Sequence, residues 1–337
     1  MNRPVSQFLT SIWLLTLAVT PVSAQVFESV GQRALGMGGA FVAVANDSSA
    51  TWWNPAGLAT GPFLDLSLGG NSATADADLP GSGTGVWSFS LGTPALGVSY
   101  YRLRLTDIRP LVPTGAPDGG REDRAAAVGI RSLSVSQFGA TVLHTITTGV
   151  SAGATVKFLR GTARVRQLEG ADADVSVPEL LDAADDLDGG DGDGSLDVDV
   201  GVLAVYGAVR LGVTGRNLRE PRFDGRRLAR QVRAGVAFDG AAVDRTPIVL
   251  SLDVDLARYE GTAGERRVIA VGGEHWVRPR RIGLRGGAMF NTVGERDRAV
   301  TAGASVAARA GLFVEGHAAF GSNTGESGWG IAARVSF

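Results

Sequence analysis

The stretch WGIAARVSF, at residues 329–337, alternates strictly between two kinds of side chain. Trp329, Ile331, Val335 and Phe337 belong to an apolar stripe, and the intervening residues are small except for Arg334. Successive side chains of an extended strand point to opposite faces, so a period of two residues is typical of a strand. The stretch therefore predicts a β-strand with one apolar face and an aromatic last residue.

The same period recurs along most of the chain, for example at residues 150–158, 232–238 and 252–256. Alternation alone leaves two folds open. A soluble sandwich buries its apolar faces, whereas a membrane barrel turns them toward lipid and lines its lumen with the polar faces. Residues 95–105 begin in one phase and end in the other, which predicts a β-bulge near Tyr100 and Tyr101.

Two features of the pattern favour the membrane barrel. We count about 14 such strands, which is too many for a small soluble barrel filled by its own side chains. The faces opposite the apolar stripes carry small or charged residues, as a wet lumen allows. We therefore predict an all-β fold, a transmembrane antiparallel β-barrel over residues 63–337. The side chains expected to face its lumen are Arg210, Arg233, Asp253, Asp255, Arg285, Phe313 and Arg334.

The terminal stretch resembles the C-terminal strand of bacterial outer-membrane proteins. In that class the terminal aromatic residue closes the barrel and is recognised by the barrel-assembly machinery. The resemblance implies that Trp329, Ile331, Val335 and Phe337 lie in the barrel-closing strand, and that outer-membrane lipid and the assembly machinery are partners. The alternative is an ordinary edge strand. A closed barrel has the advantage that it pairs every backbone N–H and C=O group, as lipid requires.

The N-terminal residues and the composition agree with export. Residues 1–24 have the form of a secretory signal peptide, with Arg3, an apolar core over residues 8–19 and a small-residue cleavage site ending at Ala24. The alternative, a membrane anchor, needs about 20 apolar residues. The chain of 337 residues has no cysteine and a net charge of −2. We therefore expect no disulfides, no thiolate metal site and no nucleic-acid partner.

Residues 25–62 precede the first predicted strand and are dense in glycine. A barrel of this size encloses a lumen that its own side chains do not fill. We expect this segment to fold inside the barrel as a plug. Gly36, Gly38 and Gly39 permit tight turns and close approach to the wall, and Phe41 with two tryptophans fills space.

The run ALGMGGAFVAVANDSSATWWNPAGLA, at residues 34–59, resembles the N-terminal hatch of the FadL-type outer-membrane transporter superfamily. The matching residues are Gly36, Met37, Gly38, Gly39, Ala40 and Phe41, followed by Asn54, Pro55 and Ala56. A second run, which contains Asn217, Leu218 and Pro221, resembles a segment of the PorV- and TraF-like branch of that superfamily. The resemblance implies a hatch-plugged barrel in the outer membrane of a diderm bacterium.

The superfamily implies two functions. The favoured one is uptake of small hydrophobic molecules, such as fatty acids or hydrocarbons, by a FadL-like transporter. The alternative is a PorV/TraF-like barrel that serves a secretion or conjugation system as a structural or assembly partner. Transport predicts a continuous apolar pocket beside the hatch and an opening in the wall. A structural role predicts a lumen filled by polar side chains and a sealed wall.

An acidic stretch at residues 182–199 contains eight aspartates. Asp186, Asp188, Asp191 and Asp193 alternate with glycine in a way that suits calcium, although the strict calcium-loop spacing is absent. The alternatives are a calcium site and a solvated acidic loop, and calcium is the one cofactor that we consider. Residues 178–186 predict a short helix before this loop. The sequence supplies no Ser–His pair for nucleophilic chemistry, so we do not expect an enzyme.

Overall fold

A computed structural model describes residues 28–75, 81–110, 127–169, 175–185, 192–223, 226–243, 246–261, 264–277, 281–294, 296–322 and 326–337. The predicted signal peptide at residues 1–24 lies outside these ranges.

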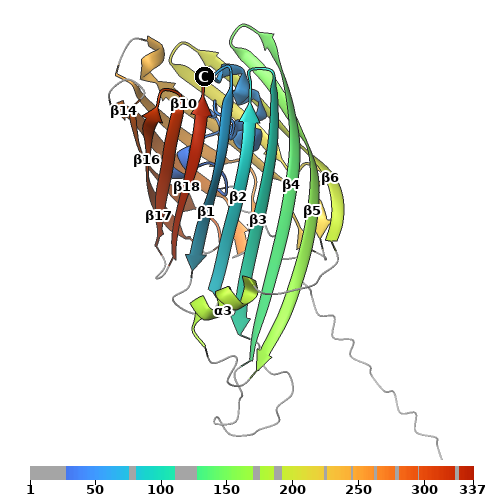
Figure 1. Cartoon of the computed structure of the whole chain (residues 1–337). Coiled ribbons are helices and arrows are strands. Elements are labelled where there is room, and N and C mark those ends of the chain that lie inside the picture. The colour runs from blue at the N-terminus through green and yellow to red at the C-terminus, as the bar shows by residue number, and fades with distance from the viewer. Residues whose placement is uncertain are drawn as a thin grey trace, which may run out of the picture.

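Within the described residues, fourteen antiparallel strands form a closed barrel (Figure 1). The order around the ring is β1-β18-β17-β16-β15-β14-β11-β10-β7-β6-β5-β4-β3-β2. The strands are β1 (Asp65–Ala75), β2 (Gly81–Gly92), β3 (Leu96–Pro110), β4 (Ala127–Thr147), β5 (Val150–Glu169), β6 (Gly192–Tyr206), β7 (Val209–Arg216), β10 (Gln231–Asp239), β11 (Ile248–Asp255), β14 (Val268–Val277), β15 (Ile282–Asn291), β16 (Arg298–Arg309), β17 (Leu312–Gly321) and β18 (Glu326–Ser336). The predicted fold class and strand number are confirmed.

The terminal strand β18 closes the ring by pairing with β1 on one side and β17 on the other. Beyond the ladder, the backbone of Phe337 exchanges two hydrogen bonds with that of Leu64, at 2.9 and 3.2 Å. β1 begins at Asp65, two residues after the predicted start of the barrel. Each of the fourteen strands pairs with two neighbours, so the wall has a hydrogen-bonded ladder at every junction between described strands. Some strands extend past one neighbour, and residues 163–169 of β5 pair with β4 alone.

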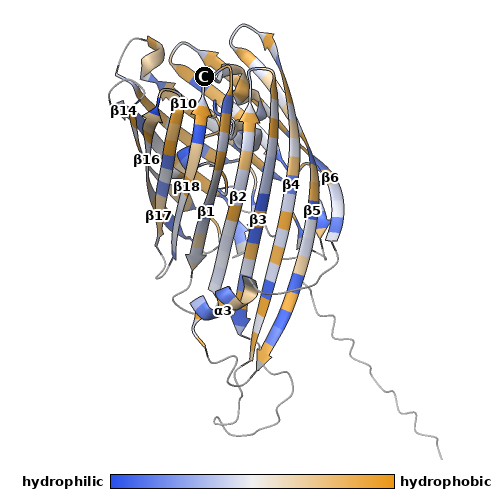
Figure 2. Cartoon of the chain, viewed as in Figure 1, coloured by the Kyte–Doolittle hydropathy of each residue, from blue (hydrophilic) through white to orange (hydrophobic). Residues whose placement is uncertain are grey.

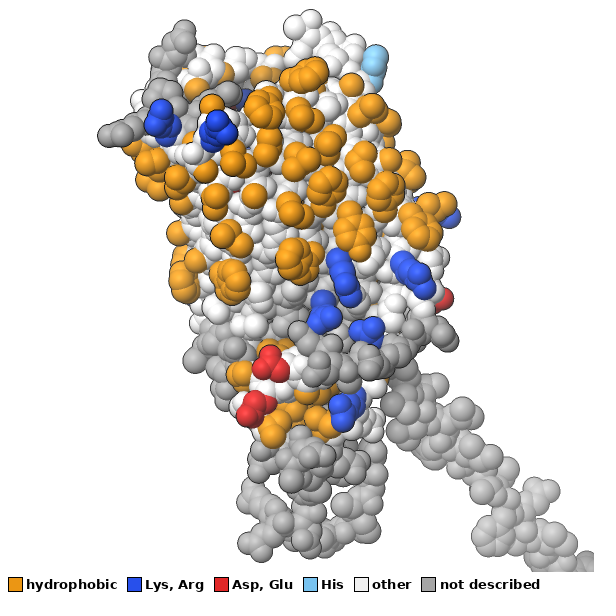
Figure 3. Space-filling model, in the orientation of Figure 1, with side chains coloured by type: hydrophobic (Ala, Val, Ile, Leu, Met, Phe, Trp, Pro, Cys, Tyr) orange, Lys and Arg blue, Asp and Glu red, His pale blue; other side chains and the backbone are white. Residues whose placement is uncertain are grey.

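The two faces of each strand differ in polarity, and the apolar face points outward. In β11, Leu252 is 40% exposed on the outside, while the next residue, Asp253, is fully buried on the inside. The strands of Figure 2 change colour from residue to residue for this reason. On the face that Figure 3 shows, the outward apolar side chains form a band over the upper and middle part of the barrel. The arrangement is that of a membrane barrel, in which the apolar face meets lipid.

No helix among the described residues is long and apolar enough to cross a membrane.

The predicted bulge near Tyr100 and Tyr101 is wrong. β3 keeps one continuous register with both neighbours, and Tyr100 faces outward while Tyr101 is buried inside. The polarity of the two faces changes instead of the register. The next two outward residues after Tyr100 are arginines, whereas the inward residues Leu103 and Leu105 are apolar and buried. This part of the outer face lies beyond the apolar band. The inner face of the same residues packs against chain segments inside the barrel.

The two ends of the barrel have different connections. At the end where the chain terminates, β4 and β5 are joined by residues 148–149, and β6 and β7 by residues 207–208. We call this the short-turn end. At the opposite, long-loop end, residues 170–191 and 217–230 connect strands. This end carries the small pairs β8 (Arg222–Phe223) with β9 (Arg226–Arg227), and β12 (Tyr259–Gly261) with β13 (Gly264–Arg266). The short helical turn η3 (Gly240–Val243) lies at the short-turn end.

Helix α3 (Val177–Asp185) lies across the lower ends of β2 and β3 on the outer face of the barrel (Figure 1). Leu180 packs in a buried cluster with Ile108 of β3 and Ile130 of β4. Ile108 belongs to the outward-facing set of β3, so α3 covers the part of the outer wall that extends past the apolar band. The helix predicted at residues 178–186 is confirmed to within one residue.

Residues 28–62, which we call the inner segment, cross the lumen. The segment contains α1 (Gln32–Gly36), α2 (Ala50–Trp53) and the 3-10 turn η1 (Pro55–Thr60). Helix α1 contacts β15 to β18, whereas η1 contacts β4 to β6 on the opposite side of the ring. The lumen is therefore occupied from one wall to the other.

We predict that a charge on the outer face is costly in the middle of the apolar band and cheap at its rim. Leu252→Arg should lower the free energy of folding into lipid vesicles by about 2–4 kcal/mol. Ile248→Arg, near the short-turn end of the same strand and face, is the matched control and should cost about 0–1 kcal/mol. Equal costs at the two positions would contradict the placement of the band.

Candidate functional site in the barrel lumen

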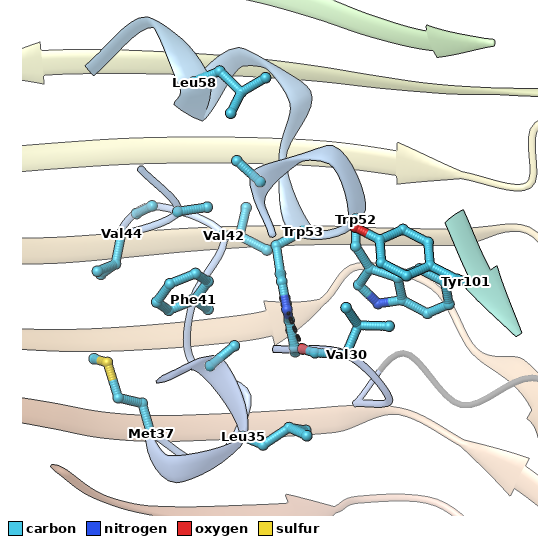
Figure 4. Close-up of a cluster of buried hydrophobic side chains, with 14 of the residues drawn as sticks. Val30, Leu35, Met37, Phe41, Val42, Val44, Trp52, Trp53, Leu58 and Tyr101 are labelled. Carbon is cyan, nitrogen blue, oxygen red and sulfur yellow. Dashed lines mark hydrogen bonds between the residues drawn. The ribbon is translucent and has the colours of Figure 1, made fainter. Parts of the chain in front are cut away.

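The inner segment builds an apolar core inside the barrel (Figure 4). Trp52 and Trp53 are fully buried. Trp52 meets Tyr101 of β3 edge-on, with 5.2 Å between ring centroids, and Trp53 meets Phe41 in the same manner at 5.9 Å. The indole N–H of Trp53 donates to the carbonyl oxygen of Val30 at 2.8 Å. These aromatic side chains hold the segment in one compact shape.

Glycine is needed where the segment turns and where it touches the wall. Gly38 and Gly39 have φ of 66° and 78°, a left-handed conformation that other residues rarely adopt. The carbonyl group of Met37, just before this turn, lies against Gly272 and Gly287 of the wall. A Cβ atom at either wall position would overlap Met37, so the small residues of β14 and β15 allow the segment to lie directly on the sheet.

Asn54 connects the segment to itself and to the wall. Its side-chain amide donates to the carbonyl oxygens of Val42, at 2.9 Å, and of Val202 in β6, at 3.1 Å. Its side-chain oxygen accepts from the backbone N–H of Ala56, at 3.2 Å, and so caps η1. Proline at the first position of η1 suits this start, because its missing N–H has no partner there. The Asn-Pro-Ala run is thus the point at which the segment reaches the far wall.

Three groups of charged side chains join the inner segment to the barrel. The first is centred on Glu274 of β14, whose carboxylate accepts two hydrogen bonds from Arg33 of the inner segment, at 2.8 and 2.9 Å. Arg285 of β15 donates to the same carboxylate at 2.7 Å. All three side chains are nearly or fully buried. Two guanidinium groups on one buried carboxylate make this contact strongly directional.

The first group continues across β17, β18 and β1. Arg334 of β18 lies 3.1 Å from Glu315 and 3.4 Å from Asp65. Asp47 of the inner segment lies 3.3 Å from Arg33. Burial opposes ionisation of Asp47, but Arg33, Arg334 and a neighbouring serine hydroxyl hold the pKa of this carboxyl below its ordinary value. Its stabilising contribution is therefore present at neutral pH and is lost as the pH falls through the native pKa.

The second group lies on β10 and β11. Both backbone N–H groups of Phe41 and Val42 donate to one carboxylate oxygen of Asp253, at 2.8 Å each. Arg233 bridges Asp255 of the wall, at 2.7 Å, and Glu28 of the inner segment, at 2.5 Å. The wall therefore supplies both a cation and an anion to the segment here.

The third group lies on β5, β6 and β7 and is fully buried. Lys157 lies 3.0 Å from Asp197 and 2.7 Å from Asp199, and it donates to the side-chain oxygen of Asn217 at 2.8 Å. Arg216 places its guanidinium over the ring of Trp52, 3.5 Å from the centroid. The inner segment thus meets this group through a cation–π contact.

Asn217 begins residues 217–230, which we call the inner loop. The backbone N–H of Asn217 donates to Asp199 at 2.8 Å, and its side-chain amide donates to the carbonyl oxygen of Ala229 at 3.1 Å, so both ends of the loop are held. Phe223 and Leu228 point into the lumen. They pack in a buried cluster with inward-facing residues of β3, β4 and β5, namely Leu105, Leu133, Val135 and Leu159.

The residues predicted to face the lumen are all on the inner face. Arg210 pairs with Asp239 at 2.6 Å, near the short-turn end. Phe313 is buried beneath Arg334, with 5.3 Å from guanidinium to ring centroid, and meets Trp276 edge-on. The other predicted lumenal residues, Arg233, Asp253, Asp255, Arg285 and Arg334, join the charged groups described above.

The remaining predicted residues are placed as follows. Gly36 ends α1 and touches Gly303 of β16, Ala40 packs with residues of β14, and Pro55 and Ala56 are buried in η1. Trp329, Ile331 and Phe337 are more than half exposed on the outer face of the closing strand, and Val335 lies on the same face. Asp186, Asp188 and Asp191 of the calcium hypothesis lie outside the described residues, and Asp193 is exposed in β6.

Sequence reasoning missed the partners of these residues. Glu274 follows Ala270 and Gly272 on the small-residue face of its strand, so its inward direction was available from the alternation. The alternation of residues 150–158 likewise gave the inward direction of Lys157, but not its pairing with Asp197 of the neighbouring strand β6. Arg33 carried no signal of its own, because its contact depends on where the inner segment lies against the wall. The inner position of Phe223 was equally hidden, because it lies in a connection between strands.

A family model described as "F plasmid transfer operon, TraF, protein" matches residues 82–255, just over half of the chain. A search among curated proteins for similar sequences found no match.

Several solved structures share the fold. The Ralstonia pickettii toluene transporter TbuX is 14% identical, with a TM-score of 0.60 over 92% of this chain and 99% of that chain. The CymD monoaromatic hydrocarbon channel is 12% identical, with a TM-score of 0.61 over 92% and 98%. A Pseudomonas aeruginosa FadL homologue is 12% identical, with a TM-score of 0.59 over 94% and 100%. The predicted resemblance to the FadL-type superfamily is confirmed at the level of fold, and none of these three is an enzyme.

We predict that Asn54→Ala loosens the inner segment. The change removes a cap and leaves two buried carbonyl oxygens without their donor, which should lower the free energy of unfolding by roughly 1–3 kcal/mol. Reversible urea unfolding in detergent micelles measures this. Thr60→Ala, an exposed position of the same segment, is the control and should change little. If the two variants unfold alike, Asn54 does not hold the segment to the wall.

Glu274→Gln should be more damaging, because it leaves the buried guanidinium groups of Arg33 and Arg285 without their shared carboxylate. The expected loss is roughly 3–5 kcal/mol of unfolding free energy. Glu265→Gln is the matched control, since Glu265 forms an exposed pair with Arg258 at 3.7 Å, and such pairs contribute about 0–1 kcal/mol. Similar losses for the two variants would show that the inner segment does not depend on Glu274.

Proposed function

The chain belongs to the TraF family, and we propose that it is a sealed outer-membrane barrel that serves a conjugation or secretion apparatus as a structural or assembly component. The description of the family points to plasmid transfer. The fold is one that hydrocarbon transporters and channels also use. Its connections fit an outer-membrane protein of a diderm bacterium, with the short-turn end toward the periplasm and the long-loop end outside the cell.

The filled lumen carries this proposal. The inner segment reaches from β15–β18 to β4–β6, and it is held by charged groups around the ring rather than by apolar packing alone. Displacing it to open a path would separate several buried ion pairs, and an unpaired buried charge costs about 3–5 kcal/mol. The ladders between neighbouring strands also leave the described wall closed. Both features agree with a plug that stays in place.

Uptake of small hydrophobic molecules is the second candidate, and one observation favours it. On the inner face at the long-loop end, the lumen is lined by apolar side chains of β3, β4 and β5, including Leu105, Leu133 and Leu159. Phe223 and Leu228 of the inner loop cover this surface. In this proposal the loop occupies the place of a fatty acid or hydrocarbon and moves aside when one binds.

A deletion strain of the native host separates the two proposals. We expect loss of the protein to lower transfer of a conjugative plasmid while uptake of radiolabelled toluene and laurate stays unchanged, because the lumen is sealed. Plasmid transfer should return when the deletion strain is complemented with the wild-type chain. It should also return with the Phe223→Ala variant, because in a structural role the apolar surface under Phe223 binds no substrate.

The opposite pattern would overturn the structural role. Reduced uptake with normal transfer supports the second candidate, and Phe223→Ala should then alter uptake. Phe320→Ala, which removes the same side chain from the outer face, is the control for that substitution.

A further inference from the structure

A groove of about 480 Å³ lies on the outer face of the barrel, over β18, β1, β2 and β3. Glycines form much of its floor. Gly83 and Gly85 of β2 and Gly70 of β1 all belong to the outward-facing set of their strands, where other strands carry large side chains. Leu181 of α3 contacts Gly83 and closes the groove toward the long loops. We call this the outer groove.

The outer groove lies at the border of the apolar band. Trp329 of β18 and Trp87 of β2 line it and are 62% and 66% exposed. Trp87 lies directly opposite Arg102 in β3, whereas the next outward pair toward the short-turn end, Phe89 and Tyr100, is aromatic on both strands. Exposed tryptophans of membrane barrels concentrate at the level where acyl chains meet headgroups. The groove is therefore at headgroup level.

Arginines gather along the same border. Arg102 and Arg104 line the groove, and Arg160 of β5 lies on the same face two strands away, aligned with Arg102 through Ser136. Figure 3 shows cationic side chains along the lower edge of the apolar band, above α3. Neither Arg102 nor Arg160 has an ion-pair partner among the acidic side chains that the structure describes. The inward arginines of the lumen, by contrast, lie against carboxylates.

We propose that the outer groove binds the phosphate group of an anionic lipid of the outer leaflet. Guanidinium groups match phosphate with paired, charge-assisted hydrogen bonds, so Arg102 and Arg104 hold the phosphate. Asp182, at the α3 end of the groove, keeps the phosphate toward Arg102 and the tryptophans by repulsion. The lipid continues along the apolar band, which opens directly from the groove.

The occupant is a membrane lipid and not free phosphate because of where the groove opens. Its apolar border, with Trp87 and Trp329, faces the acyl-chain region, and a free ion uses none of that surface. The proposal rests on the outer-membrane location proposed above. It does not depend on the sealed lumen or on a role in conjugation.

Binding of fluorescent diphosphoryl lipid A to the full-length barrel, purified in a neutral detergent, tests the proposal. The wild-type chain should bind saturably. Arg102→Gln and Arg104→Gln should each weaken binding by about tenfold, the change expected from loss of one charge-assisted contact. Arg309→Gln, an exposed arginine at the short-turn end, is the matched control and should bind as the wild type does.

A second variant tests the groove without removing charge. No atom lies within 4 Å of a Cβ atom added at Gly85, so Gly85→Leu fills the groove without disturbing the wall. Heat-modifiable migration in gels verifies that every variant is folded. Gly85→Leu should weaken lipid binding as the arginine variants do.

Several outcomes would overturn the proposal. They are unchanged affinity in the Arg102→Gln/Arg104→Gln double variant, equal binding of lipid A from which both phosphates have been removed, and full displacement by millimolar inorganic phosphate, which would identify a free-anion site. Cell fractionation separates the two proposals. A chain absent from the outer membrane contradicts the proposed function, whereas a chain that is present there but does not bind lipid A contradicts this inference alone.

Discussion

The structure depends on one constraint, that a chain crossing lipid must pair all of its backbone N–H and C=O groups. Antiparallel strands meet this constraint only when the sheet closes, and here β18 closes it by pairing with β1. A ring of fourteen strands is wider than its own inward side chains can fill. That width leaves room for the inner segment, which fills space that water would otherwise occupy.

The charges of the lumen explain how that segment is held. A carboxylate or guanidinium on the inner face has little water around it, so it needs a partner of opposite charge. Arg33 and Glu28 bring such partners from the inner segment, while Glu274 and Arg233 bring them from the wall. Pairs of this kind do not tolerate sliding, because each guanidinium has a fixed set of donor directions. The inner segment is therefore held in one position inside the barrel.

The polarity change in β3 connects the two faces of the barrel at the long-loop end. Past Tyr100, the inner face becomes apolar and is covered by Phe223, whereas the outer face becomes basic. The same few residues therefore end the apolar band on the outside and begin a second hydrophobic cluster on the inside. The inner hydrophobic cluster bears on what the lumen can hold. The basic border of the apolar band bears on the proposed lipid contact at the outer face.

The sequence indicated the fold class, the approximate strand number and, for most strands, which residues share the apolar face, because a two-residue period is a local property of the chain. It also indicated that Arg233, Asp253 and Arg285 face inward. Only the tertiary structure decided which groups these side chains contact. Arg285, for example, shares the carboxylate of Glu274 with Arg33, which is 241 residues from Glu274 along the chain. The tertiary structure also decided that the change of phase at Tyr100 is one of environment and not a bulge. The contact between Arg33 and Glu274 depends on where the inner segment lies against the wall, and that position is a property of the closed ring.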